Sequence, residues 1–432
     1  MRRRVNGGKA LLIDGPARVH LLSGAAEVLG AEVKPEMSIV IRQGKRLPFE
    51  ARPEFEAEIF MGEQASCTEI NASAIPNSWR ETVASILSEK SRTTVLMLGG
   101  VDSGKTGFCI YLANSALKAN QEVSVIDSDL GQSDLGPPGT IGLCFVKKPF
   151  TDLFRLFPDD SVFIGVTSPS WAVNNVLDAV QKLKAEALKR NVDLLIINTD
   201  GWIDGEDAVK YKVRLVETIN PDYIVAIRTG DELNPLISSL KERNVILVDT
   251  PENIKKRDRE TRRLLRGFAY KKHLRGSKIR TFPLSWVKVE GSLNLNAEKR
   301  DQLKDEIQGI LKTEIVCCEE TSHSIVLILG RKAEISEETM RIAEMKIGKR
   351  LIPLREGNER GLLVSLEDST GKMLGTGTIH SIDFKNMIIK ISTPVEKAVS
   401  KIRIGRIKLD SEGNEEEILF QSSKYALTGK DD

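Results

Sequence analysis

The feature that most constrains the fold of this chain is an eight-residue segment that directly follows an apolar run. The segment fits G-x-x-x-x-G-K-[ST] at every fixed position and consists of Gly99, Gly100, Val101, Asp102, Ser103, Gly104, Lys105 and Thr106. In such a loop the glycines let backbone N–H groups turn toward phosphate oxygens, the lysine reaches the β- and γ-phosphates, and the hydroxyl binds Mg²⁺. The following helix directs its positive N-terminal end at the anion. The segment therefore predicts a strand–loop–helix unit that binds a nucleoside triphosphate.

The residues around this loop predict the sheet to which it belongs. Apolar runs of strand length recur at residues 93–98, 122–126, 161–166, 193–198, 223–227 and 245–248. Helical patterns lie between most of them, at residues 105–119, 174–189 and 208–219. Continuous apolar strands that alternate with helices indicate a buried, mostly parallel sheet. We therefore predict an α/β fold whose centre is a P-loop NTPase domain with a parallel sheet, at residues 91–285.

The two ends of the chain have a different pattern. Short β-like runs occur before residue 90, at residues 19–22, 38–41 and 55–61, and a helical stretch at 78–90 follows them. Beyond residue 286, a helical stretch at 297–312 precedes runs at 324–329, 361–367, 376–382, 387–392 and 401–409. Strands separated by turn residues predict an N-terminal β domain at residues 1–90 and a C-terminal β-rich barrel or sandwich at residues 286–432.

Composition limits the possible partners. The net charge is only +2, so any affinity for nucleic acid must come from local basic patches. No apolar run approaches the roughly 20 residues that cross a bilayer, and we expect no membrane partner. The five cysteines form no C-x-x-C pair, which argues against a zinc site and a disulfide framework. We expect a cytoplasmic protein with reduced thiols.

A P-loop enzyme also needs a carboxylate for Mg²⁺ or for the attacking nucleophile, and two strand ends offer one. Asp127 and Asp129 follow one strand, and Asp200 follows another. Both ends lie at the carboxyl edge of the sheet, where ligands bind in open α/β folds. We favour the first, because residues two apart can share one side of an extended segment and because Gln132 follows in a glycine turn. Thr106 and Asp129 are thus the candidate metal ligands.

Two further motifs resemble those of the polynucleotide 5′-hydroxyl kinase family. One is D-x-D-x-G-Q, at residues 127–132, and the other is T-x-G-W, at residues 199–202. The Thr-Ser-Pro-Ser turn at residues 167–170 is also similar. Residues 15–24 look like the N-terminal β domain of that family, and residues 361–383 and 405–409 look like its C-terminal domain. The resemblance therefore covers most of the chain.

The resemblance implies an ATP-dependent kinase that phosphorylates the 5′-hydroxyl end of RNA in RNA processing, with DNA open as a second acceptor and RNA-processing proteins as partners. It assigns the phosphates and Mg²⁺ to Lys105 and Thr106, and the role of base to Asp129 with Gln132 assisting. The clasp that grips the terminal nucleotides corresponds to Thr199, Gly201 and Trp202, and Asp127 is a further substrate-binding candidate. An indole that stacks on a base contributes about 1–3 kcal/mol.

A basic stretch near the end of the central domain supplies further candidates. We predict a helix within residues 252–270, whose arginines are Arg257, Arg259, Arg262, Arg263 and Arg266. The family has a lid with an R-x-x-x-R pair, and here Arg259 with Arg263 and Arg262 with Arg266 both fit. Such arginines would stabilise the transferring phosphoryl group. A solvated basic face and a surface for RNA phosphates remain alternatives.

Two other functions remain open at this point. A P-loop ATPase or GTPase switch would use the same loop and carboxylate to position a water, although the chain lacks a clear N-K-x-D guanine reader; residues 228–231 do not match it. An ATP-binding scaffold of an RNA-processing complex would need no catalysis. The intact Lys105, Thr106 and Asp129 argue against the scaffold.

Overall fold

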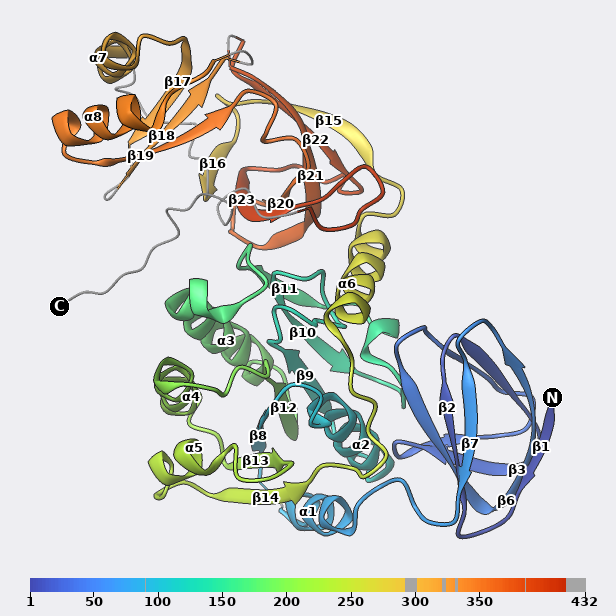
Figure 1. Ribbon diagram of the computed structural model, residues 1–432. Helices are drawn as coiled ribbons and strands as arrows, with labels where there is room; N and C mark the ends of the chain where they lie inside the picture. Colours follow the sequence, from blue (N-terminus) through green and yellow to red (C-terminus); the bar gives the residue numbers. More distant parts are fainter. Residues whose placement is uncertain (90, 292–300, 321–323, 331–332, 385, 417–432) are drawn as a thin grey trace. The chain divides into compact units, whose positions relative to one another are not determined.

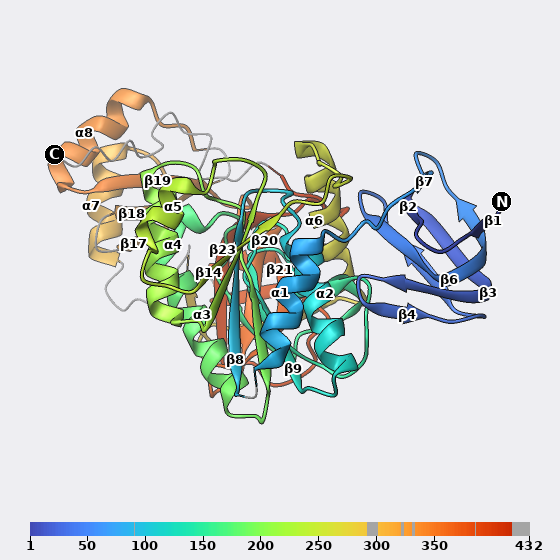
Figure 2. The same ribbon diagram turned by 90° about the horizontal axis from the view of Figure 1, so that it is seen from below.

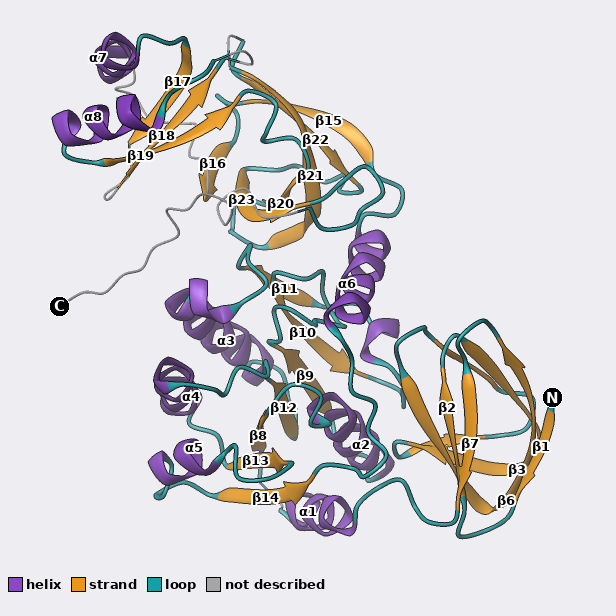
Figure 3. Cartoon of the chain, in the orientation of Figure 1, coloured by secondary structure: helices purple, strands orange, loops and turns teal. Residues whose placement is uncertain are grey.

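The computed structural model describes residues 1–432 except 90, 292–300, 321–323, 331–332, 385 and 417–432. The chain divides into two compact units, Met1–Ala269 and Tyr270–Asp432. Each unit contains both helices and strands, which are distinguished in Figure 3. The candidate site belongs to the first unit.

The first unit begins with a seven-stranded antiparallel sheet of order β4-β3-β6-β2-β7, in which β1 pairs with β6 and β5 pairs with β3. Its strands are β1 (Arg2–Val5), β2 (Ala10–Asp14), β3 (Ala17–Val28), β4 (Ala31–Val33), β5 (Ser38–Ile41), β6 (Arg46–Met61) and β7 (Ser66–Ile70). The long strands β3 and β6 alternate between buried and exposed residues along part of their length, as a half-buried sheet does. The predicted N-terminal β structure is confirmed. Helix α1 (Asn77–Ser88) then leads into the centre.

A second sheet, of order β11-β10-β9-β12-β8-β13-β14, forms the centre of the first unit (Figure 1). Its strands are β8 (Thr93–Gly99), β9 (Val123–Asp127), β10 (Thr140–Val146), β11 (Asp160–Phe163), β12 (Leu194–Asn198), β13 (Tyr223–Arg228) and β14 (Val245–Asp249). Strands β9, β12, β8, β13 and β14 run parallel, which confirms the mostly parallel prediction. Strand β10 was not predicted. It runs antiparallel to β9 because residues 128–139 connect the two strands without the helix that a parallel crossover needs.

Helices cover both faces of the central sheet (Figure 2). One core cluster joins α1 and α2 to one face and continues into the N-terminal sheet, and a second cluster joins α3, α4 and α5 to the other face. The helices are α2 (Lys105–Lys118), α3 (Val173–Leu188), α4 (Glu206–Ile219), α5 (Asn234–Ser239) and α6 (Arg259–His273). Two short 3-10 turns, η1 (Leu153–Arg155) and η2 (Pro169–Trp171), lie in the loops. No helix in the described part of the chain is both long and apolar enough to span a bilayer.

The second unit contains a six-stranded sheet of order β15-β22-β21-β20-β23-β16 and a three-stranded sheet of order β17-β18-β19. The larger sheet is built from β15 (Lys278–Pro283), β16 (Lys288–Gly291), β20 (Leu362–Glu367), β21 (Met373–Asp383), β22 (Ile388–Thr393) and β23 (Lys401–Lys408). The smaller one is built from β17 (Ile315–Glu320), β18 (Ser324–Leu329) and β19 (Arg350–Arg355), with α7 (Asp301–Leu311) and α8 (Glu337–Ile347).

The smaller sheet differs from the β-only barrel or sandwich that the sequence predicted for this region. Helix α8 places Met340, Ala343 and Ile347 on one face at helical spacing, and these residues pack in a core with α7 and the strands. Ser336 caps the helix by accepting the backbone N–H of Thr339. This region is therefore a small α/β layer. The start of the predicted helix 297–312 lies outside the described residues, and α7 is its described part.

Candidate active site

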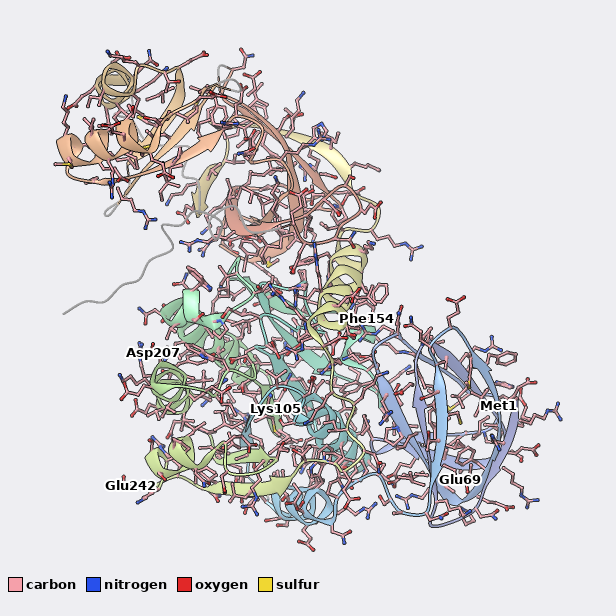
Figure 4. The ribbon with its side chains drawn as sticks, in the orientation of Figure 1. Met1, Glu69, Lys105, Phe154, Asp207 and Glu242 are labelled. Carbon is pink, nitrogen blue, oxygen red and sulfur yellow. The ribbon has the colours of Figure 1, made fainter. Side chains whose placement is uncertain are left out.

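The phosphate-binding motif forms the turn between β8 and α2. Strand β8 ends at Gly99, and α2 begins at Lys105, which Figure 4 labels. Gly104 has φ +109°, and a Cβ there would lie 3.3 Å from atoms of Trp79, Pro251 and Ile254. Only glycine tolerates both the backbone conformation and the close packing. The loop therefore has the conformation that the motif predicts.

The ammonium of Lys105 is held at the base of this loop. Its Nζ donates to the carbonyl oxygens of Gly99 (2.9 Å) and Gly100 (2.7 Å). Burial lowers the pKa of Lys105 to about 8, against the opposing attraction of Asp129. A phosphate oxygen beside this ammonium would stabilise its charged form, as the carboxylate of Asp129 does.

A cavity of about 550 Å³ lies over the loop, and it collects residues from far apart in the sequence. The motif lines it with Val101, Asp102, Ser103, Gly104, Lys105 and Thr106. The loops after β9, β12 and β14 contribute to the wall, and so does the turn between β5 and β6 of the N-terminal sheet. The cavity is therefore enclosed by both sheets of the first unit.

Asp129 lines the cavity in a fixed orientation. Its Oδ1 accepts hydrogen bonds from the backbone N–H groups of Gly131 (3.1 Å) and Gln132 (3.0 Å). Burial raises the pKa of Asp129, the carboxylate of Asp200 raises it further, and the Lys105 ammonium opposes both effects. The carboxyl group thus faces the cavity with a raised proton affinity. Gln132 also lines the cavity.

Asp127 has a different environment from Asp129, although the sequence suggested that the two would share one side. It is buried, and Asn198 donates to its Oδ1 at 3.0 Å. The backbone N–H of Asp134 donates to its Oδ2 at 3.0 Å. Burial and the neighbouring carboxylates Asp129 and Asp134 raise its pKa to about 6. Strand β9 ends at Asp127, so the two-residue period of a strand does not extend to Asp129, and Asp127 is absent from the cavity lining in the described residues.

The loop that follows β12 is fixed by a buried ion pair. Lys212 of α4 is fully buried, and its ammonium lies 2.9 Å from Oδ2 of Asp200. Oδ1 of Asp200 accepts the backbone N–H of Trp202 at 2.9 Å, and Oδ2 accepts the hydroxyl of Tyr211 at 2.9 Å. The indole of Trp202 stacks on the ring of Tyr211, with centroids 5.6 Å apart and planes at 23°. Asp200, the carboxylate at the second strand end, thus fixes the conformation of the clasp-like loop.

The other clasp candidates, Thr199 and Gly201, lie in the same loop, on either side of Asp200. Gly201 lines the cavity, and a Cβ on it would come within 2.7 Å of the backbone nitrogen of Val101. The glycine is therefore required by the close approach of the loop to the phosphate cradle. Thr199 is fully buried, and its hydroxyl donates to the carbonyl of Met97 at 2.7 Å. Among the described residues Thr199 is not part of the cavity lining.

The basic segment before and within α6 lines the cavity with only some of its arginines. Arg262 and Arg266 are in the lining, whereas Arg259 and Arg263 are not, among the described residues. Helix α6 begins at Arg259, and it faces the cavity only along the side that carries Arg262 and Arg266. Of the two R-x-x-x-R frames, the geometry favours Arg262 with Arg266.

Arg262 has an environment suited to an anionic ligand. Its Nη2 donates to the carbonyl of Arg257 at 2.7 Å and lies 3.9 Å from Oδ2 of Asp102. Its Nε is buried, and no acceptor in the described part of the chain is within hydrogen-bond reach of it. A buried donor of this kind fits a phosphate oxygen in the cavity.

Arg257 holds this segment against the cradle, a contact that the sequence did not suggest. Its backbone N–H donates to Oδ2 of Asp102 at 2.9 Å, and its Nε donates to Oδ1 at 2.8 Å. Asp102 adopts φ +56°, a left-handed conformation that aspartate tolerates better than most residues. Position 102 is variable in the motif, and the contacts with Arg257, 155 residues away, give its carboxylate a structural role.

A second contact that the sequence did not suggest ties the Asp129 loop to the N-terminal sheet. Arg42 and Lys45, in the turn between β5 and β6, lie 2.9 Å and 2.5 Å from the carboxylate of Asp134. Arg42 also pairs with Asp152 at 2.8 Å. Burial would raise the pKa of Asp134, but Lys45 and Arg42 hold it well below its usual range. The N-terminal sheet thus clamps residues 128–139, in which Asp129 lies.

The oxygen ligands of the site suit Mg²⁺, and they do not suit a metal ion that is held by protein side chains alone. In the described residues, no group of three or more His, Cys, Asp or Glu side chains could hold a metal. The Thr106 hydroxyl and the Asp129 carboxylate line the same cavity. Mg²⁺ is bound in enzymes by one or two such side chains together with phosphate oxygens and waters, so the two residues fit it.

Comparisons with known proteins agree with this geometry. A family model described as mRNA cleavage and polyadenylation factor CLP1 P-loop matches residues 99–276. A polyribonucleotide 5′-hydroxyl-kinase of Pyrococcus abyssi is 33% identical over 344 residues, which are 79% of this chain and 94% of that protein. A polyribonucleotide 5′-hydroxyl-kinase of Methanocaldococcus jannaschii is 29% identical over 358 residues, 81% of this chain and 96% of that protein.

A solved structure of a Clp1p–Pcf11p complex has the same fold, with a TM-score of 0.64 and 13% identity over 94% of this chain and 97% of that chain. The identity to the Pyrococcus protein, over nearly all of its length, decides the relationship. The resemblance seen in the sequence is confirmed: the chain belongs to the polyribonucleotide 5′-hydroxyl-kinase family.

Proposed function

We propose that this protein transfers the γ-phosphoryl group of ATP to the 5′-hydroxyl end of RNA. One observation carries the proposal beyond family membership: Lys105, Asp129 and Trp202 line one cavity, which joins a phosphate cradle, a carboxylate and an aromatic clasp. A nucleotide switch needs the first two of these features but has no use for the third.

The chemistry follows from the positions of these groups. Lys105 and the backbone of the cradle bind the β- and γ-phosphates, and Asp129, oriented by the N–H groups of Gly131 and Gln132, accepts the proton of the 5′-hydroxyl. The hydroxyl oxygen then attacks the γ-phosphorus, and the bond to the leaving ADP breaks. Mg²⁺, held by Thr106 and Asp129, would neutralise charge on the phosphates.

Arg262 and Arg266 are proposed as the lid arginines that stabilise the transferring phosphoryl group. Their presence in the lining and the buried Nε of Arg262 support this frame. Gln132 is proposed to assist at the hydroxyl. Asp127 is proposed as a positioning residue instead of a substrate-binding one, because both of its oxygens are occupied. Oδ1 accepts from Asn198 at the end of β12, and Oδ2 accepts from the backbone of Asp134 in the loop that carries Asp129.

The nucleotide base is proposed to lie between the cradle and the N-terminal sheet. Apolar side chains of β6, of the connection after β7 and of α1 line the cavity, among them Leu47, Ile75 and Trp79. A purine would bury its faces there. The division into domains at residues 1–90, 91–285 and 286–432 stays a prediction, and so do protein partners from RNA processing.

The test is a transfer assay with γ-labelled ATP and matched 5′-hydroxyl oligonucleotides of RNA and DNA. The proposal expects label on the RNA, and the DNA arm measures acceptor choice. Release of labelled phosphate at the same rate with and without RNA would instead support a switch. Nucleotide binding without transfer or release would support a scaffold.

A further inference from the structure

A second hollow in the first unit, of about 930 Å³, lies between the N-terminal halves of α3 and α4. We call it the α3–α4 groove. Its residues are Ser170, Trp171, Ala172, Val173, Asn174, Asn175, Trp202, Asp207, Val209, Lys210, Tyr211, Val213, Arg214 and Ser239. Figure 4 labels Asp207 on the α4 side. None of the chemistry proposed above uses this groove, apart from the shared residue Trp202.

The groove adjoins the catalytic cavity at two turns. Trp202 lines both hollows. The 3-10 turn η2 also contributes to both, because Pro169 lines the cavity and Trp171 lines the groove. A chain that leaves the cavity past the clasp therefore enters the groove directly.

The groove presents aromatic surface toward solvent. Trp171 is 44% exposed, so its indole is accessible to a ligand. Trp202 is backed by Tyr211, whose hydroxyl is anchored on Asp200, so the indole is held rigidly. Rigid, exposed rings are what unpaired bases stack on, with little regard for their sequence.

The polar groups of the groove suit a phosphodiester backbone. Lys210 and Arg214 lie one turn apart on α4, so both face the same side of the helix. Arg214 Nη2 donates to Oδ1 of Asn174 at 2.8 Å, which orients the guanidinium toward α3. Lys210 pairs with Glu206 at 3.2 Å, but both are exposed, and a pair of this kind exchanges readily for another anion. Asp207 is the acid that opposes these two cations within the lining.

We propose that the α3–α4 groove binds the RNA downstream of its 5′ end, with the second base stacked on Trp171 and the phosphate that follows it on Arg214 and Lys210. The proposal rests on the proposed kinase function, which supplies a 5′-terminal nucleotide in the adjoining cavity. Such a subsite makes the enzyme select polynucleotides over single nucleotides. An unpaired strand is required, because stacked neighbours cover both faces of the second base in a duplex.

The test compares two acceptors, a 5′-hydroxyl nucleoside 3′-phosphate and a 5′-hydroxyl hexaribonucleotide. Trp171→Ala should raise KM for the hexamer about 5- to 160-fold, the range that one stacked base gives. KM for the mononucleotide and kcat at saturation should stay within about twofold, because Trp171 is outside the cavity lining. Trp171→Phe should restore most of the loss, and Trp286→Ala, which removes another exposed indole, should change neither KM. Arg214→Gln should raise KM for the hexamer and flatten its dependence on salt.

A binding measurement separates this inference from the kinase function. The fluorescence of a hexamer with 2-aminopurine at its second position should be quenched by the wild-type protein and not by Trp171→Ala. Loss of quenching in the variant supports the groove even if no phosphoryl transfer is found. Retained quenching, or an equal change of KM for both acceptors, overturns it even in an active kinase.

Discussion

At the scale of single residues, the site separates two aspartates that are two positions apart. Asp129 faces the cavity with two backbone N–H groups on one oxygen, whereas Asp127 is enclosed by Asn198 and the backbone of Asp134. The first can exchange a proton with a substrate, and the second holds the loop in shape. Their chemistry is set by burial and partners, since the two residues are identical in kind.

Replacing Asp129, the proposed general base, should abolish phosphoryl transfer and preserve the binding of ATP. We expect Asp129→Asn to lower kcat for RNA phosphorylation by about 10²- to 10⁴-fold, because an amide cannot accept the proton of the hydroxyl. The dissociation constant for ATP, measured by calorimetry without metal, should change little. Asp178→Asn, which alters an exposed residue of α3, is the matched control. Loss of ATP binding in Asp129→Asn would contradict the assignment of the base.

The buried lysine of α4 should matter for stability. Lys212→Met leaves Asp200 buried without its cation, and breaking a buried pair costs about 3–5 kcal/mol of unfolding free energy. Urea unfolding measures this loss of unfolding free energy. Lys210→Met on the same helix breaks only the exposed pair with Glu206 and should cost less than about 1 kcal/mol. Equal losses in the two variants would show that the ion pair with Asp200 contributes no stability.

At the scale of elements, the carboxyl edge of the central sheet brings the parts of the site together. Strands β8, β9 and β12 are neighbours and run parallel, so the turns that follow them meet at one edge. The cradle, the Asp129 loop and the clasp-like loop are these three turns. Their contacts are close, as Gly201 against Val101 shows.

That contact gives a prediction about the turn after β12. Gly201→Ala would bring a Cβ to 2.7 Å from the backbone nitrogen of Val101, so the clasp must move away from the cradle. We expect kcat/KM for RNA to fall about 10- to 100-fold, since displacements near 1 Å have effects of this size. In Gly230→Ala the nearest atom is Oε2 of Glu232 at 3.5 Å, so steady-state kinetics should be unchanged there. Unchanged kinetics in Gly201→Ala would show that the two turns move freely.

At the scale of the molecule, the cavity depends on both sheets of the first unit. The turn between β5 and β6 contributes Arg42 and Lys45, which pair with Asp134 in the loop that carries Asp129. The N-terminal sheet therefore holds the loop that carries Asp129, and it also lines the cavity in which we propose that the nucleotide binds. Every described residue that lines the cavity lies within the unit Met1–Ala269.

The clamp predicts a dependence of stability on pH. Because Lys45 and Arg42 lower the folded-state pKa of Asp134, its carboxylate stabilises the fold fully above the unfolded-state pKa of about 3.9. This contribution is lost as the pH falls through the much lower folded-state pKa. The unfolding free energy of the wild type should exceed that of Asp134→Asn by a constant amount from pH 7 to pH 5, and the excess should shrink below about pH 4.

Urea unfolding at several pH values measures this difference. In an Arg42→Ala background the excess should be smaller at every pH, because one of the two cations that lower the pKa is gone. An excess that grows as the pH falls would have the wrong sign for a depressed pKa and would refute the clamp.

The sequence by itself determined the features that local backbone conformation encodes. The phosphate cradle, the parallel sheet and the kinase family follow from short motifs and apolar periods, because glycine positions and hydrophobic spacing act within a few residues. It could not choose between Arg262 with Arg266 and Arg259 with Arg263, and it did not distinguish the environments of Asp127 and Asp129. The tertiary structure shows which of these arginines line the cavity, and it gives the two aspartates different partners. It also creates the contacts from Arg257 to Asp102 and from Arg42 to Asp134. Those contacts join residues 155 and 92 positions apart, and such partners are chosen by packing across the whole unit instead of by any local pattern.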